Sequence, residues 1–284
     1  NRGAKVIVYQ SDEVSVPLGV ARVKVADARK SMAKFTKKFY DSPDESLSLI
    51  GITGTNGKTT VSTLTRHLLE EPGCPVGLIG TVQYNLGGRD VPSFKTTPEA
   101  ADLCPVLKSM LAAGCSSSVM EISSHGIHQS RVNGISLEIA VFTNLTRDHL
   151  DYHGSMEEYY QEKRKLFNGM NGPLPKVAII NGDCPYGKRL IQELPPQVQV
   201  LTFGFEVGNQ FCAKNLTLDA EGSKFVMESP LGNTVVASPL IGRYNVSNVL
   251  ASFAIMHAMG KSVVESIHKL RSFKGVCGRM ESVD

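Results

Sequence analysis

The sequence lacks the features that mark membrane-spanning, secreted or nucleic-acid-coating proteins. No uninterrupted apolar run among its 284 residues approaches the roughly 18 residues of a membrane-spanning helix, so we expect no membrane partner. The formal net charge is only +3, and Lys and Arg are scattered, which argues against nucleic acid as a partner. The chain begins with Asn1 rather than Met, and no signal-peptide pattern follows it. We therefore expect a fragment or a trimmed chain.

The cysteines lack the spacing of a metal or redox motif. They stand at positions 74, 104, 115, 184, 212 and 277, and no two form a C-x-x-C pair. This spacing argues against a zinc site or a thioredoxin-type redox pair. Dispersed free thiols are typical of a reducing compartment, so we expect a cytoplasmic protein.

The composition favours a folded protein of one or two domains. Hydrophobic residues make up 42% of the chain and charged residues 20%, which predicts a globular core. We interpret residues 1–46 as part of a small α/β unit, with strands at 6–9 and 21–25 and a helix at 27–39. One face of that helix carries Ala28, Met32, Phe35 and Phe39. The run 41–44 has the composition of a linker.

Strands and helices alternate after this linker. The expected strands are 47–52, 76–80, 117–122, 138–143, 176–181 and 198–203, and the expected helices are 58–70, 98–113, 155–168, 184–194, 245–259 and 262–272. This order predicts an α/β domain over 47–284, with a mostly parallel sheet covered by helices. The short alternating runs and turns at 209–238 predict a small β appendage of the same domain. In such sheets ligands bind at the carboxyl ends of the strands.

A phosphate-binding loop follows the first of these strands. The run comprises Gly54, Thr55, Asn56, Gly57, Lys58, Thr59 and Thr60. Loop N–H groups and Lys58 can contact phosphate oxygens, and a Thr hydroxyl can bind Mg²⁺. The first Gly of the common G-x-x-x-x-G-K-[ST] pattern would fall at position 52, which is Ile. The run nevertheless predicts binding of ATP or a close relative.

The helix predicted at 155–168 carries a lysine on its apolar side. Ser155 and Glu158 form a capping box, and Lys163 falls within an apolar stripe that also contains Met156, Tyr159, Tyr160, Leu166 and Phe167. A buried, unpaired ammonium is costly, so its pKa falls unless the long stem snorkels to water. A neutral amine can also react with CO₂ to give a carbamate, an oxygen ligand suited to Mg²⁺. The pattern alone favours snorkelling and leaves the carbamate open.

Polar residues follow two other strands. Glu121 ends one strand and could bind Mg²⁺, and His149 follows the next as a possible metal ligand that Asp148 or Asp151 could orient. Taken singly, each residue also fits a loop position with local hydrogen bonds. Arg131 could clamp a carboxylate or phosphate, or form an ordinary surface ion pair.

Six runs in this order resemble the Mur ligases of bacterial cell-wall synthesis. They are GTNGKTT at 54–60, TTPE at 96–99, EISSHG at 121–126, NLTRDHLDYHG at 144–154, GRYNVSN at 242–248 and GRME at 278–281. The resemblance implies an ATP-dependent ligase that adds an amino acid to UDP-N-acetylmuramoyl-L-alanyl-D-glutamate (UDP-MurNAc-L-Ala-D-Glu). The acceptor carboxylate attacks the γ-phosphate to give an acyl phosphate, and the incoming amine then displaces phosphate. Catalysis then rests on positioning and charge neutralisation.

The resemblance also assigns roles to individual residues. It implies a catalytic set of Lys58, Glu121, His149 and Lys163, and it favours the carbamate at Lys163 over snorkelling. One Mg²⁺ would be held by Thr59 and Glu121, and a second by His149 and the carbamylated Lys163. Nucleotide contacts would come from the loop 54–60, Asn245, Asn248 and Arg279. Substrate contacts would come from Thr96, Thr97, Ser123, Gln129 and Arg131.

The family pattern extends beyond this chain at both ends. Residues 1–46 would be part of the N-terminal UDP-substrate domain, and a C-terminal domain that binds the incoming amino acid would follow residue 284. We expect a monomer whose partners are the UDP-muramyl dipeptide and a free amino acid, with the fragment itself poorly active. Two alternatives stay open: a ligase of the folylpolyglutamate-synthetase type, and a non-catalytic scaffold similar to the plastid homologues of the family.

Overall fold

A mostly parallel sheet forms the centre of the molecule. The computed structural model describes residues 3–11, 13–276 and 278. In spatial order the strands are β13 (Gly232–Ser238), β12 (Gly222–Ser229), β11 (Phe211–Asp219), β10 (Gln199–Gly204), β9 (Val177–Asn181), β8 (Ile139–Phe142), β3 (Ser48–Thr53), β7 (Ser117–Glu121), β4 (Val76–Ile79), β5 (Gln83–Asn85) and β6 (Asp90–Pro92). All neighbours from β11 to β4 are parallel, and the strands beyond them at both edges are antiparallel. The predicted α/β fold is confirmed.

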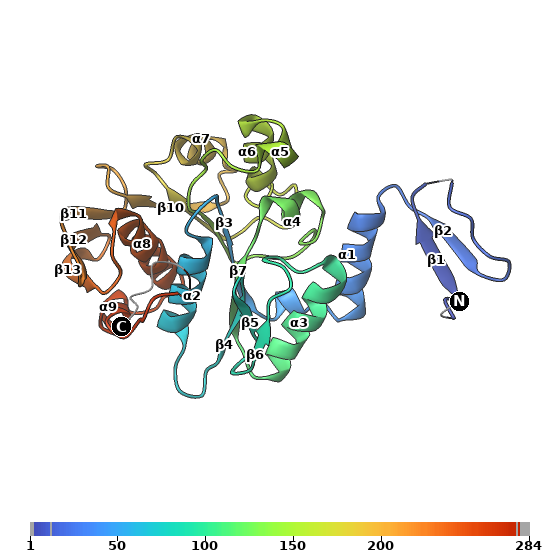
Figure 1. The fold of residues 1–284 in the computed structure, drawn as a ribbon, viewed down its shortest axis with the longest axis horizontal. Helices are drawn as coiled ribbons and strands as arrows, with labels where there is room; N and C mark the ends of the chain where they lie inside the picture. Colours follow the sequence, from blue (N-terminus) through green and yellow to red (C-terminus); the bar gives the residue numbers. More distant parts are fainter. Residues whose placement is uncertain (1–2, 12, 277, 279–284) are drawn as a thin grey trace.

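The sheet is buried on both faces because its central strands are apolar at successive positions. Ile50 and Ile52 point into one core cluster, whereas Leu49 points into the other. The first cluster is covered by α2 (Lys58–Leu69), α8 (Arg243–Ala258) and α9 (Val263–Leu270). The second is covered by α3 (Ala100–Ala112), α4 (Ser124–His128), α6 (Met156–Arg164) and α7 (Pro185–Glu193) (Figure 1). Near-continuous apolar runs are what strands covered by helices on both faces require.

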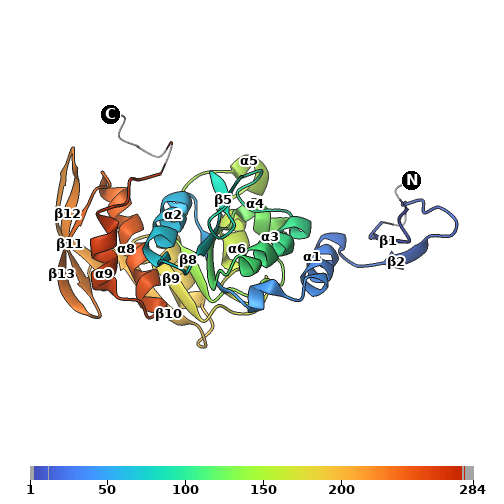
Figure 2. The same ribbon diagram turned by 90° about the horizontal axis from the view of Figure 1, so that it is seen from below.

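The predicted β appendage is continuous with the main sheet. β11 pairs with β10 through Phe203–Phe211 and Gly204–Cys212, and β12 and β13 extend it as an antiparallel meander. Figure 2 shows these strands at one end of the molecule, with α8 and α9 beside them. The short elements that were not predicted include β5, β6, α4 and α5 (Leu150–His153).

The first 46 residues pack against the rest of the chain through one long helix and the short segment that follows it. Strands β1 (Val6–Tyr9) and β2 (Ala21–Lys24) pair in parallel and project from the end opposite β13 (Figure 2). Helix α1 (Ala28–Phe39) lies next to α3 and buries Ala33. The predicted apolar face is not a buried one, because Met32, Phe35 and Phe39 are half or more exposed.

The segment 41–44 is an anchor rather than a loose linker. The short 3₁₀ helix η1 (Pro43–Glu45) buries Asp44, whose Oδ2 accepts from Lys37 Nζ at 2.8 Å and from Ser136 N at 2.8 Å. Lys37 Nζ also donates to Gly134 O at 2.9 Å. Burial alone would lower the pKa of Lys37, but its contacts with Asp44 and Glu45 outweigh burial and raise it. The end of α1 is therefore fixed to the loop before β8.

Among the described residues, no helix combines the length and the apolar character that crossing a membrane requires.

Candidate functional site

The phosphate-type loop lies where β3 turns into α2. Gly57 stands at the start of α2 with φ +88°, and no side chain caps the helix. A Cβ on Gly57 would lie 2.4 Å from Asn248 Oδ1, and one on Gly54 would lie 1.9 Å from Thr143 Oγ1. These two positions therefore require glycine. The uncapped N–H groups of the first turn can donate hydrogen bonds to a bound anion.

The segment after β8 holds this loop in shape. Asn144 accepts from Thr55 N at 3.0 Å through its carbonyl and from Asn56 N at 2.9 Å through Oδ1. Thr143 Oγ1 donates to Asn56 O at 2.6 Å. These supporting roles of Thr143 and Asn144 were not predicted, because neither residue has a hydrogen-bond partner close to it in the chain.

Two lysines meet beneath the loop. Lys58 Nζ donates to Gly54 O and Thr55 O, both at 2.9 Å, and Lys163 Nζ donates to the same Gly54 O at 3.1 Å and to Thr53 Oγ1 at 3.3 Å. Lys163 is only 1% exposed and lies over the Tyr159 ring at 4.7 Å. Burial, aided by the charge of Lys58, holds the pKa of Lys163 well below its ordinary value. Snorkelling is therefore wrong for Lys163.

The N-cap half of the predicted capping box is confirmed at the start of the Lys163 helix. Ser155 Oγ accepts from Glu158 N at 3.2 Å, and Tyr159 and Tyr160 are buried on the same side as Lys163. Arg189 of α7 binds Glu157 at 2.6 Å and packs over the Tyr160 ring, which joins α6 to α7.

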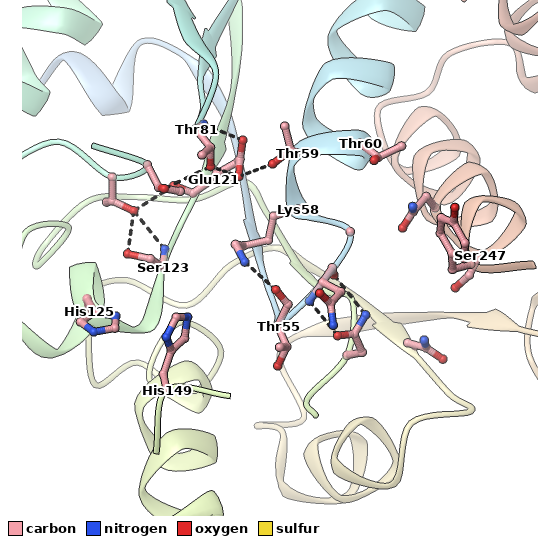
Figure 3. A pocket seen from close by; sticks show the side chains of 18 of the residues that line it. Thr55, Lys58, Thr59, Thr60, Thr81, Glu121, Ser123, His125, His149 and Ser247 are labelled. Atoms are coloured by element: carbon pink, nitrogen blue, oxygen red, sulfur yellow. Dashed lines mark hydrogen bonds between the residues drawn. The ribbon is translucent and has the colours of Figure 1, made fainter. Parts of the chain in front are cut away.

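Glu121 is completely buried at the end of β7, directly across from the loop. Its Oε2 accepts from Thr59 Oγ1 at 3.0 Å and Thr81 Oγ1 at 2.9 Å, and its Oε1 accepts from Thr81 N at 2.8 Å (Figure 3). Thr81 was not predicted, because it follows the short strand β4 with no motif around it. The predicted pairing of Thr59 with Glu121 is a contact in the structure.

His149 begins α5 on the far side of the loop. Its backbone φ is +52°, and its ring lies 5.1 Å from that of His125 and 6.1 Å from that of Tyr159. Asp148, not Asp151, is its acidic neighbour, with Oδ2 3.5 Å from His149 Nε2. Burial lowers the pKa of His125, and it lowers that of nearby His153 to about 4. Figure 3 shows His125 and His149 next to each other, on the side of the cavity away from Glu121.

The predicted substrate residues gather on the Glu121 side. Thr97 Oγ1 donates to Glu121 O at 3.0 Å and accepts from Ser123 N at 3.0 Å, and Thr96 Oγ1 lies 3.1 Å from Thr81 Oγ1. Arg131 is mostly buried and binds Thr97 O at 3.0 Å. It also pairs with Glu99 at 3.2 Å, so the predicted ion pair is present, but the Arg131 side chain is only 11% exposed and is not an ordinary surface residue. The hydrogen bond from Lys95 lowers the pKa of Glu99, and Arg131 adds to this effect.

The opposite wall belongs to α8. Asn248 Nδ2 donates to Asn245 Oδ1 at 3.1 Å, and Asn245 Nδ2 donates to Ile241 O at 2.9 Å. These bonds leave Asn248 Oδ1 facing Gly57. Tyr244 is half exposed at the rim. Arg279 lies outside the described residues.

These groups surround one cavity of about 1100 Å³, large enough for a nucleotide and part of a second ligand. Its described lining comprises Thr55, Asn56, Gly57, Lys58, Thr59, Thr60, Thr81, Lys95, Thr96, Thr97, Glu121, Ser123, His125, Arg131, Asn144, His149, Asn181, Tyr244, Asn245, Ser247, Asn248 and Gly278. Three predicted site residues, Gly54, Gln129 and Lys163, lie behind this lining. Gln129 Oε1 accepts from Arg131 Nη2 at 2.5 Å and so supports Arg131 from behind.

The described residues contain no group of three or more His, Cys, Asp and Glu side chains that would by itself hold a metal. A cation here would need hydroxyls, ligand oxygens or a modified lysine beside Glu121 and His149. Hydroxyl and carboxylate oxygens are the donors that Mg²⁺ prefers, so Thr59 and Glu121 fit this ion.

Comparison with known proteins agrees with this geometry. The model of the Mur ligase middle domain matches residues 52–256. The UDP-N-acetylmuramoyl-L-alanyl-D-glutamate–2,6-diaminopimelate ligase of Thermosynechococcus vestitus is 42% identical over 261 residues, which are 92% of this chain and 52% of that protein. A solved structure of a ligase with the same name is 32% identical with a TM-score of 0.83, over 95% of this chain and 55% of that one.

A more distant likeness concerns the fold alone. The Mycobacterium tuberculosis folylpolyglutamate synthase, solved with ADP and AMPPCP, has a TM-score of 0.72 at 19% identity, over 89% of this chain and 64% of that one. The chain spans about half the length of the curated relatives that it matches. The match to the middle-domain model covers most of the chain, and the chain therefore belongs to the Mur ligase family.

Proposed function

We propose that the protein containing this chain is an ATP-dependent ligase that adds an amino acid, 2,6-diaminopimelate in its named relatives, to UDP-MurNAc-L-Ala-D-Glu. The observation that carries this proposal is a single cavity that joins a phosphate loop to Thr96, Thr97, Ser123 and Arg131. Nucleotide phosphates and the acceptor carboxylate would therefore meet beside Lys58 and Glu121. We further propose that residues 47–284 form the ATP-binding domain, that residues 1–46 belong to the substrate domain, and that the protein is a monomer.

The residues of the loop supply the phosphate side of this reaction. The first-turn N–H groups of α2 and the ammonium of Lys58 neutralise phosphate charge, which is greatest when the γ-phosphoryl group is transferred. Lys58 now donates to two loop carbonyls, and these contacts hold its ammonium at the loop. Asn245 and Tyr244 lie on the α8 wall, where the nucleoside would bind.

The wall opposite α8 positions the acceptor. Arg131 is braced by Gln129 and Thr97 O, so its guanidinium is fixed before the substrate arrives and can pair with a carboxylate at little ordering cost. The hydroxyls of Thr96 and Ser123 can hydrogen-bond the peptide. Mg²⁺ held by Thr59 and Glu121 would supply charge neutralisation at the phosphates.

We also propose that Lys163 carries a carbamate which, with His149, would hold a second Mg²⁺. The buried amine with a lowered pKa supports this proposal, because a neutral amine reacts with CO₂ to give a carbamate and one proton. Among the described residues, no carboxylate lies within ion-pair distance of Lys163. In ¹³C NMR with ¹³C-bicarbonate, we expect a carbamate signal that Lys163→Gln abolishes and Lys165→Gln keeps. A signal that survives Lys163→Gln would contradict this assignment.

The test of the overall function is a substrate panel on the full-length protein. We expect ADP release that requires both UDP-MurNAc-L-Ala-D-Glu and meso-diaminopimelate, and loss of turnover in Lys58→Ala. ADP release with a folate and glutamate, but not with the muramyl dipeptide, would identify the folylpolyglutamate-type alternative. Nucleotide binding without turnover of any acceptor would favour the scaffold.

A further inference from the structure

Thr81 contributes most of the hydrogen bonds to the buried Glu121 carboxylate. Its backbone N–H reaches Oε1 at 2.8 Å and its hydroxyl reaches Oε2 at 2.9 Å, whereas the phosphate loop contributes one bond, from Thr59 Oγ1 at 3.0 Å. Hydrogen bonds to a charged group are stronger than neutral ones. The orientation of Glu121 is therefore set from two sides, by the phosphate loop and by Thr81 (Figure 3).

The residue before Thr81 makes this close approach possible. A Cβ on Gly80 would lie 2.8 Å from Glu121 Oε1. With glycine there, the backbone can bring the Thr81 N–H to the carboxylate without a collision. Gly80 therefore allows the backbone at Thr81 to approach the Glu121 carboxylate closely.

The same hydroxyl connects Glu121 to the predicted substrate loop. Thr81 Oγ1 lies 3.1 Å from Thr96 Oγ1, and each hydroxyl has one proton to donate. Because a carboxylate only accepts, Thr81 gives its proton to Glu121, and Thr96 must then donate to Thr81. Thr96 is left with acceptor lone pairs, which suit an N–H or O–H donor of a ligand. Thr97 ties the same loop to the Glu121 carbonyl at 3.0 Å.

We propose that Thr81 is a positioning residue that couples the nucleotide side of the cavity to the acceptor side. This inference rests on the proposed function, in which the two ligands bind on either side of Glu121. The chain of contacts runs Thr96 to Thr81 to Glu121, with Thr59 joining from the phosphate loop. A ligand on either side would hold this chain of contacts in place, and so would remove part of the ordering cost for the other ligand. The coupling is therefore positive and reciprocal.

The first test measures this coupling as binding linkage in the full-length protein. Calorimetry gives the Kd of Mg²⁺-AMP-PNP with and without UDP-MurNAc-L-Ala-D-Glu. We expect the acceptor to tighten nucleotide binding about fivefold or more, which is the usual size of such coupling. Thr81→Val should reduce this ratio of nucleotide Kd values to about twofold or less. Thr81→Ser, which keeps the hydroxyl, should leave the ratio close to that of the wild type. Thr234→Val on β13 is the matched control, because it makes the same change far from the cavity. An undiminished ratio in Thr81→Val would overturn the proposal.

The second test needs no acceptor. Hydrogen exchange of residues 93–99 should slow when Mg²⁺-AMP-PNP binds to the wild type and to Thr81→Ser, but not when it binds to Thr81→Val. Equal protection in all three would overturn the coupling role. If the wild type binds AMP-PNP but not the muramyl dipeptide, the proposed substrate is wrong, and the exchange result still decides the role of Thr81. If it binds neither, both proposals are overturned.

Discussion

At the scale of single residues, Lys163 has the least favourable surroundings for its charge. The ammonium is buried and shares the Gly54 carbonyl with a second lysine, Lys58. Its pKa lies well below the ordinary value of 10.5, so between the two pKa values the unfolded chain binds one more proton than the folded chain. The free energy of unfolding therefore rises with pH across this window.

A substitution that removes this charge should change the pH dependence of stability. In CO₂-free buffer without nucleotide, Lys163→Met should raise the free energy of unfolding at pH 7, by about 1–4 kcal/mol by analogy with other buried charges replaced by apolar groups. The advantage should shrink as pH rises toward 10. Urea unfolding at several pH values measures both effects, with Lys165→Met as the control on the same helix. A pH-independent difference between wild type and Lys163→Met would contradict the lowered pKa.

Arg131 should affect one substrate more than the other. Arg131→Ala removes a charged hydrogen-bond donor from the part of the cavity where the UDP-substrate would bind. It should raise the KM for the UDP-substrate about tenfold or more, with a smaller effect on the KM for ATP. Steady-state kinetics of the full-length enzyme provide both values. Arg29→Ala is the matched control, because Arg29 is more exposed and lies near the same Glu99 at 3.9 Å. A larger effect on ATP would mean that Arg131 serves the nucleotide.

The sequence predicted individual site residues where a motif surrounds them, and failed where only the fold brings residues together. Lys58, Thr59 and Glu121 each stand at or shortly after the end of an apolar strand, so their position at the same edge of the sheet could be predicted. Thr81 and Asn144 also follow apolar strands, but their roles were not predicted, because the groups that they contact lie 40 and 88 residues away in the chain. The burial of Lys163 also depends on the neighbouring loop, which the helical stripe cannot reveal.

At the scale of elements, the start of α2 depends on Gly57. Gly57→Ala should weaken nucleotide binding and lower stability, because Ala would have a strained φ of +88° and would press on Asn248. Gly232→Ala is the control: its φ is +101°, but a Cβ there meets nothing within 4 Å. It should cost about 1 kcal/mol of stability and leave nucleotide affinity unchanged. Equal nucleotide affinities in the two variants would show that a side chain pressing on Asn248 does not disturb the phosphate loop.

The anchor at the end of α1 gives a second prediction at this scale. Lys37→Met would leave the Asp44 carboxylate buried without its ammonium partner, so the free energy of unfolding should fall by about 3–5 kcal/mol. Lys38→Met changes an exposed neighbour and should have little effect. Denaturant unfolding compares the two, and an equal loss would mean that helix propensity, not the ion pair, is responsible.

Element types were predictable because alternating strands and helices leave local patterns of apolar residues. The shortest elements, such as α5 and β6, are too brief for any periodicity to show. For α1 the helix was predicted correctly, but the burial of its apolar face was not found. An apolar face in the sequence indicates a surface that could be covered, and does not identify what covers it.

At the scale of the whole molecule, the proposed domain boundary near residue 46 lies beside buried contacts between the two segments. Strands β1 and β2 bond chiefly to each other, so removing residues 1–25 should leave the melting temperature nearly unchanged. Removing residues 1–46 also deletes Lys37 and Asp44 and should lower it by about 4 °C or more. Thermal unfolding of the two shortened chains measures this. Equal melting temperatures would show that these contacts contribute little to the fold.

The cavity has walls that are far apart in the chain, with Thr96 on one side and Asn248 on the other. During synthesis on the ribosome, the phosphate loop emerges some 190 residues before the helix that closes over it. We therefore expect the early stages of folding to proceed without help from bound nucleotide. Only a nearly complete domain would then present the whole of the proposed nucleotide site.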